Sequence, residues 1–275
     1  MPQFGRSLRY NSKMLKLNTM SKLSTNHQFL DFSDYGRPVA KWIANNLKNT
    51  ATTPIHVTFG FAISALIAMA CMLNHYYWTA GFFLILKSIL DAADGELSRV
   101  KNTPSYTGRY LDSNFDFIIN LLLLITICYI TEGSWFYTFI AFICIQLQGT
   151  LYNYYYVIIR NKYKGGDKTS RIIEDKAPKA FEDESQTTVD ILFFFYTLFY
   201  GIFDKIIYNL DKEAVDVKHF PNWFMSLISI FGLGFQLLIM SVMLAFGWID
   251  YIIPFFIYYT LLLVLFMGIR KRFVQ

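Results

Sequence analysis

The chain has 275 residues, of which 54% are hydrophobic and 19% aromatic, whereas only 16% are charged. Soluble globular domains contain about 25% charged residues, so this composition excludes an ordinary soluble domain as well as a disordered chain. The net charge is +5, but the basic residues form no stripe of the kind that binds nucleic acid, and we expect no nucleic-acid partner. The composition predicts an all-α integral membrane protein.

Residues 1–54 are predicted to form a cytoplasmic N-terminal segment that ends in an amphipathic helix. Between positions 35 and 49, apolar and basic residues recur at helical spacing: Val39, Trp42, Ile43 and Leu47, with Arg37, Lys41 and Lys48. Such a helix lies on the inner leaflet with its basic side chains toward the lipid headgroups. The alternative is a soluble helix packed on the rest of the protein.

Six later segments are long and apolar enough to cross a bilayer, which requires about 20 predominantly apolar residues. They cover residues 55–73, 77–98, 109–131, 135–159, 223–246 and 251–268. A further apolar stretch from Ile191 to Phe203 is bounded by Asp190 and Asp204, and its shortness predicts an interfacial or buried helix. We therefore expect one six-helix membrane catalytic domain over residues 55–275, with a cytoplasmic connection at 160–221.

The basic residues orient these six spans. Every Lys and Arg except Lys87 lies in residues 1–54, 99–109, 160–221 or 270–272, and the other short loops contain none. Cytoplasmic loops are enriched in Lys and Arg. Both termini are therefore predicted to be cytoplasmic, in a bacterial inner membrane or an equivalent membrane.

Four aspartates lie where the second and third predicted spans meet the cytoplasm. Asp91 and Asp94 are three residues apart, whereas Asp112 and Asp116 are four apart. Residues at these spacings share a helix face, and the turn between the two spans is short, so all four carboxylates are expected to converge.

Such a cluster needs cations, because charged carboxylates repel one another. An all-oxygen site without His or Cys suits Mg²⁺ or Mn²⁺, and two such ions would form a clamp for phosphoryl transfer. Gly95 and Gly108 leave the backbone open to a phosphate or nucleotide, and Arg99 supplies a planar cation for phosphate oxygens. Lys87, four residues before Asp91, either neutralises the cluster or extends toward water.

The stretch from Asp91 to Asp116 resembles the signature of the CDP-alcohol phosphotransferase (CDP-alcohol phosphatidyltransferase) family, D-x-x-D-G-x-x-A-R-x₈-G-x-x-x-D-x-x-x-D. Seven of the eight specified positions agree, and Ser98 stands where Ala is usual. Pro54 and Thr58 resemble the entry to the first span of this family, although Ile55 replaces its common Asn. The six spans and the amphipathic N-terminal helix are also similar to the family.

The resemblance implies a role for each motif residue. Two metal ions would be bound by the four carboxylates of Asp91, Asp94, Asp112 and Asp116. Asp116 would also be the general base that takes the proton from the acceptor hydroxyl. The positions implied to hold the CDP moiety are Gly95, Ser98, Arg99, Ser105 and Gly108, with Thr58 lining the same pocket.

The implied reaction is direct attack of an alcohol on the β-phosphorus of a CDP-linked donor, with release of CMP. We favour CDP-diacylglycerol as donor and a small polar alcohol as acceptor. The alternative within the family is a CDP-choline or CDP-ethanolamine donor with a diacylglycerol acceptor. Members with phosphorylated acceptors often carry a basic residue directly after the last motif Asp, and Phe117 in that position argues against a sugar phosphate. The alternative is that Arg109 or the basic stretch at 160–179 substitutes for that residue.

Two further points remain open at the level of sequence. The resemblance allows a homodimer. From another functional class, a cation channel or proton-coupled transporter is the alternative, because intramembrane acids often mark ion pathways.

Overall fold

The computed structural model of the chain describes residues 29–162 and 174–274, and within these ranges it is all-helical, without strands. The first part contains α2 (Arg37–Leu47), α3 (Pro54–Leu73), α4 (Tyr77–Lys101), α5 (Tyr106–Ile130) and α6 (Trp135–Lys162). The second part contains α7 (Gln186–Leu210), α8 (Asn222–Ile228), α9 (Leu233–Ala245), α10 (Ile252–Tyr259) and α11 (Leu261–Phe273). The predicted all-α fold is confirmed.

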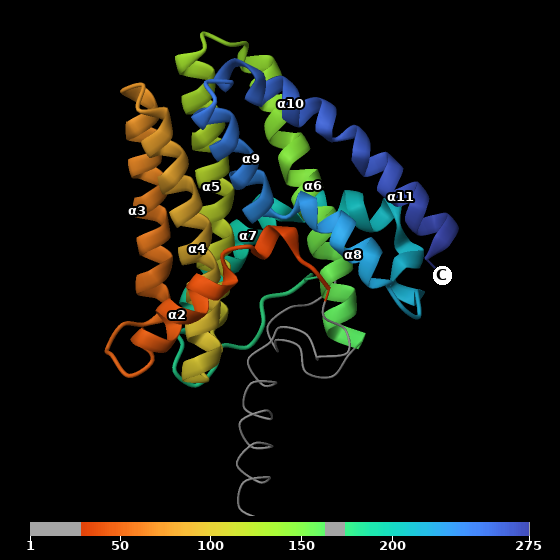
Figure 1. Cartoon of the computed structure of the whole chain (residues 1–275). Helices are drawn as coiled ribbons and strands as arrows, with labels where there is room; N and C mark the ends of the chain where they lie inside the picture. The colour runs from red at the N-terminus through yellow and green to blue at the C-terminus, as the bar shows by residue number, and fades with distance from the viewer. Residues whose placement is uncertain (1–28, 163–173, 275) are drawn as a thin grey trace, which may run out of the picture.

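Helix α4 lies at the centre of the contacts that position the site. It packs against α2, α3 and α9, and α5 packs against α3 and α7 (Figure 1). A hydrophobic core between these helices, α6 and α10 includes the fully buried side chains of Phe61, Leu123 and Phe256. Because α3 packs against both α4 and α5, it holds these two helices on either side of the site.

The turn between α4 and α5 is defined by its capping residues. Asn102 ends α4 in the left-handed region, with φ 55°, a conformation that Asn tolerates better than most residues. Ser105 begins α5, and its side-chain oxygen accepts a hydrogen bond from the Gly108 N–H at 2.7 Å. These caps hold the carboxylate-bearing ends of the two helices close in space.

Four helical segments are long and apolar enough to cross a membrane: Pro54–Leu73, Tyr106–Ile130, Gln186–Leu210 and Ile249–Phe273. The pair formed by Asn222–Phe231 and Leu233–Ala245 would be a fifth, but it is bent by 53°. Helices form at all six predicted span positions, although α4 and α6, with 25 and 28 residues, are long enough but not apolar enough to qualify as spans. The count of six spans stays a prediction.

The expectation of a short, interfacial or buried helix at 191–203 is wrong in length, and of its two alternatives the buried helix is contradicted. Helix α7 has 25 residues, and only 11% of its most apolar window is buried. Asp190 and Asp204 lie within the helix instead of ending it, because single charged residues can be placed on a solvent-facing or paired side of a helix. An interfacial position stays a prediction, and in Figure 1 α7 passes behind α6, across the direction of α3 and α5.

The predicted N-terminal helix is present as α2. Ala40 and Ala44 pack against α4, whereas Val39 is 47% and Trp42 is 68% exposed. Its placement on a membrane surface stays a prediction. Residues 1–28 of the predicted N-terminal segment and 163–173 of the predicted connection lie outside the described residues.

Candidate active site

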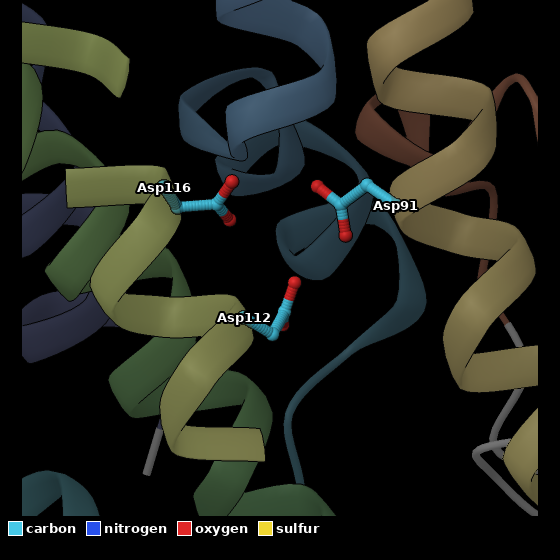
Figure 2. Close-up of side chains that lie close together, drawn as sticks. All are labelled: Asp91, Asp112 and Asp116. Atoms are coloured by element: carbon cyan, nitrogen blue, oxygen red, sulfur yellow. The ribbon is translucent and has the colours of Figure 1, made fainter. Parts of the chain in front are cut away.

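Three of the four aspartates lie together between α4 and α5. One carboxylate oxygen from each of Asp91, Asp112 and Asp116 lies within 4.8 Å of the other two. Figure 2 shows Asp91 on α4 facing Asp112 and Asp116, which lie on successive turns of α5. The three side chains point into the same space, so one small cation could contact all of them.

The chemistry of this cluster fits a divalent metal ion. All three ligands offer oxygen, which hard ions such as Mg²⁺ and Mn²⁺ prefer. Asp112 Oδ1 is buried and has no hydrogen-bond partner within the described ranges. Because burying an unpaired charged oxygen is costly, a cation at this point would supply the partner that the protein leaves out.

Asp94 lies against α3 and outside this group of three. Thr58 donates a hydrogen bond to Asp94 Oδ2 at 2.8 Å, and Asp94 is only 8% exposed. The structure therefore brings Thr58 to the predicted cluster through Asp94. A role of Asp94 as a metal ligand stays a prediction.

Lys87 lies inside the cluster. Its Nζ is 3.0 Å from Asp91 Oδ2 and 2.5 Å from Asp116 Oδ1, and its side chain is 0% exposed. Of the two roles that the sequence left open for Lys87, the structure shows neutralisation, because the ammonium group turns inward and does not reach water.

Arg99 and Gly95 lie next to each other near the C-terminal end of α4. Arg99 forms an ion pair with Glu96 at 2.9 Å, and its Nε is buried without a partner in the described part of the chain. A Cβ atom on Gly95 would come to 3.6 Å from the Arg99 guanidinium. Gly95 thus lies within contact range of this cation, and the binding of an anionic group by the two residues stays a prediction.

A contact between α2 and Glu96 on α4 was not predicted from the sequence. Arg37 donates to the same Glu96 at 2.6 Å and also pairs with Asp34. Burial alone would lower the pKa of Arg37, but the two carboxylates outweigh burial and raise it. The N-terminal helix is thus tied by charge to the motif helix.

The start of α5 is held by Glu184, a second residue that sequence reasoning missed. Ser105 Oγ donates to Glu184 Oε1 at 2.7 Å, and the Thr107 N–H donates to the same oxygen at 2.7 Å. Burial would raise the pKa of Glu184, but these hydrogen bonds outweigh it and lower the pKa. Glu184 lies 79 residues after Ser105 in a segment without a motif, so no local signal could have found it.

The remaining predicted residues lie around the same turn. Ser98 donates to the Thr103 carbonyl at 2.8 Å and closes the turn between α4 and α5. A Cβ atom on Gly108 would come to 3.2 Å from Ser105 Oγ, so the absence of a side chain there permits the tight cap. The motif residues therefore surround the ends of two adjacent helices.

Comparison with known proteins agrees with this arrangement. A model of the CDP-alcohol phosphatidyltransferase family matches residues 51–210, which is more than half of the chain and contains every aspartate of the cluster. No curated protein matches the chain. The family consists of phosphotransferases that use CDP-alcohol donors and alcohol acceptors and generally depend on divalent metals. Together with the four apolar helices, this match indicates an integral membrane protein, and the chain belongs to the CDP-alcohol phosphatidyltransferase family.

Proposed function

We propose that the protein transfers a substituted phosphate from CDP-diacylglycerol to a small polar alcohol, with release of CMP, as a step in phospholipid biosynthesis. The observation that carries this proposal is the convergence of Asp91, Asp112 and Asp116 in a segment that matches a phosphotransferase family. The site would face the cytoplasm, with both chain termini on the same side of the membrane.

The residues proposed to hold two Mg²⁺ or Mn²⁺ ions are Asp91, Asp94, Asp112 and Asp116. Asp112 Oδ1, which has no partner among the described residues, supports this assignment. When bound, the ions would neutralise the negative charge that develops on the phosphates and on the departing CMP. Asp94 is held in place by the Thr58 hydroxyl, so Thr58 would act on the site by orienting that carboxylate.

Asp116 is the proposed general base. It takes the proton of the acceptor hydroxyl while that oxygen forms a bond to the β-phosphorus of the donor. The bond between the β-phosphorus and the oxygen that bridges it to CMP breaks, and this oxygen leaves with CMP. The Asp116 side chain is 14% exposed, so it can be reached from outside the core, as a general base that contacts substrate must be.

The CDP moiety is proposed to lie along the turn between α4 and α5. Arg99 supplies a cation whose Nε has no partner in the described ranges, and Gly95 places no side chain beside it. The short cap of Ser105 and Gly108 brings backbone close to the same region, and Ser98 holds the turn closed. These contacts favour an anionic, planar group such as a cytidine diphosphate.

The acceptor is proposed to lack a phosphate group. Phe117 stacks on Phe199 with ring centroids 4.5 Å apart and meets Phe142 edge-on at 5.0 Å. This aromatic packing leaves no cation at the position directly after Asp116, where a second phosphate would need one.

A donor-by-acceptor matrix tests the proposal. CDP-diacylglycerol, CDP-choline and CDP-ethanolamine are each paired with serine, inositol phosphate, glycerol phosphate or diacylglycerol, and CMP release and lipid products are measured by mass spectrometry. We expect the fastest CMP release from CDP-diacylglycerol with an unphosphorylated alcohol. Fastest release with a sugar phosphate would overturn the acceptor assignment. Absence of CMP release from every pair would contradict the enzyme proposal and favour cation or proton transport.

A further inference from the structure

Lys87 is a fully buried cation placed among the residues that are proposed to bind metal. It lies on α4, one turn before Asp91, and reaches across to Asp116 on α5. Its Nζ also lies 4.6 Å from the centre of the Phe61 ring on α3. The ammonium group therefore has contacts from three helices, whereas a lysine that extended toward water would have none of them.

The energetics of burial explain why these contacts matter. A buried ammonium group is tolerated only when charged or polar partners surround it. Here the partners are two carboxylates at hydrogen-bond distance and the face of an aromatic ring, which attracts cations. In return, the ammonium allows Asp91 and Asp116 to lie close together without a metal between them. Removing either side of such a pair leaves an uncompensated buried charge.

One ammonium group cannot balance three carboxylates. Asp91, Asp112 and Asp116 together exceed Lys87 by two negative charges, so the cluster still attracts a divalent cation. Lys87 nevertheless repels any such ion, because like charges within a few ångströms interact strongly in a partly buried site. It also contacts two of the oxygen-bearing groups that the ion would need.

We infer that Lys87 is a positioning residue that keeps Asp91 and Asp116 assembled before metal binds and weakens the affinity of the site for that metal. This inference rests on the proposed function, because it assumes that these carboxylates bind Mg²⁺. A fixed internal cation of this kind keeps the empty site folded and makes metal binding reversible.

The test compares the wild-type protein with Lys87→Met, which preserves the length of the side chain and removes its charge. Mg²⁺ affinity is measured by titration calorimetry, and the melting temperature is measured in EDTA and in excess Mg²⁺. We expect Lys87→Met to bind Mg²⁺ about tenfold or more tightly. We also expect its melting temperature to fall by several degrees in EDTA and to return toward that of the wild type in excess Mg²⁺.

A purely structural lysine would give another pattern. Loss of packing alone would lower the melting temperature equally with and without Mg²⁺ and would leave the Mg²⁺ affinity unchanged, and that result would overturn the inference. The matched control is Lys41→Met, which removes the charge of an exposed lysine on α2. We expect this control to keep its Mg²⁺ affinity within about twofold and its melting temperature within about a degree of the wild type.

A double variant keeps the test decisive if Lys87→Met does not fold in EDTA. Lys87→Met with Asp116→Asn removes both members of the closest pair, and we expect it to recover part of the stability lost in Lys87→Met. Failure of the double variant to fold even in excess Mg²⁺ would overturn the inference. If the wild-type protein itself binds no Mg²⁺, the proposed function fails. If it binds Mg²⁺ and Lys87→Met binds it equally well, only the role of Lys87 fails.

Discussion

At the scale of single residues, Asp116 is both the closest contact of Lys87, at 2.5 Å, and the proposed general base. Replacing Asp116 with Asn preserves its size but removes the basic lone pair. We expect turnover of Asp116→Asn to fall roughly 10²–10⁴-fold, the contribution typical of a general base. Asp91 and Asp112 remain, so donor binding should stay within about tenfold of the wild type.

CMP release and calorimetry of donor binding together measure these two quantities. Substantial turnover in Asp116→Asn would show that the proton acceptor is another group.

Asp91 should respond differently from Asp116. It contributes the α4 side of the three-carboxylate group, opposite Asp112 and Asp116 (Figure 2). Asp91→Asn would remove the carboxylate that connects the two helices through a metal, and we expect both donor binding and turnover to be lost. The same two assays apply. Donor affinity equal to that of the wild type would contradict the role of Asp91 as the metal ligand from α4.

Metal dependence follows from Asp112, whose Oδ1 is buried without a partner in the residues that the structure describes. We expect activity to vanish in excess EDTA and to return on addition of Mg²⁺ or Mn²⁺, because Lys87 alone does not balance three carboxylates. CMP release is measured before and after chelation. Full turnover in excess EDTA would contradict the metal-site assignment.

The sequence predicted part of this site for a physical reason. Asp112 and Asp116 share a face because they are four residues apart in one helix, and the short turn places Asp91 opposite them. The contacts Thr58–Asp94 and Ser105–Glu184 join residues that are far apart in the chain. Helical spacing carries no information about such partners, since they depend on how whole helices pack.

At the scale of elements, the start of α5 depends on the Glu184 carboxylate. This group accepts hydrogen bonds from Ser105 and from the Thr107 N–H, so it caps the N-terminus of α5. Its negative charge also interacts favourably with the positive end of the helix dipole. Glu184→Gln should destabilise the protein by about 1 kcal/mol at pH 7, a typical capping contribution. Thermal unfolding in detergent measures the difference. Glu182→Gln, at an exposed neighbouring position, is the control and should change little.

The stability difference between the wild type and Glu184→Gln should depend on pH, and the sign of this dependence follows from the pKa of Glu184. The pKa of Glu184 is lowered in the folded protein, so its contribution is present at pH values above the pKa of an unfolded Glu, about 4.3. It is lost as the pH falls through the lower pKa of the folded state. The melting temperatures of wild type and Glu184→Gln should therefore converge below about pH 4. A constant gap down to pH 3 would contradict an ionised cap.

The break between α8 and α9 shows what apolar composition misses at this scale. The sequence predicted one continuous span at 223–246, whereas the helix bends by 53° near Gly232. The Phe32 N–H donates to Ser229 Oγ at 2.9 Å, and a side chain on Gly232 would clash with Ser33. The N-terminal segment thus packs into the bend, a contact that hydropathy along the chain does not encode.

At the scale of the whole molecule, the two ends of α7 decide how many spans there are. Its beginning follows Glu184, which is bound to the start of α5. Its end is followed by Asp211, whose buried carboxylate accepts a hydrogen bond from Arg270 Nε near the end of α11 at 2.7 Å. The distribution of Lys and Arg predicts that the start of α5 and the end of α11 are both cytoplasmic. A helix with both ends held on one side cannot cross the membrane.

We therefore expect α7 to lie at the cytoplasmic interface, which leaves six spans in spite of its apolar composition. A labelling experiment tests this expectation. In a variant whose native cysteines Cys71, Cys128 and Cys144 are changed to Ala, a single cysteine is placed at Glu182, before α7, or at Glu213, after it. Glu213 is 84% exposed, and Glu182 is also exposed, so both sites are open to a maleimide that cannot cross membranes. In sealed, right-side-out vesicles, both cysteines should react only after permeabilisation. A cysteine at Lys41 is the control for the cytoplasmic side and should behave in the same way. A cysteine at Asn74 is the control for the outer side and should react without permeabilisation. Labelling of Glu213→Cys without permeabilisation would show that α7 crosses the membrane, and the chain would then have a seventh span.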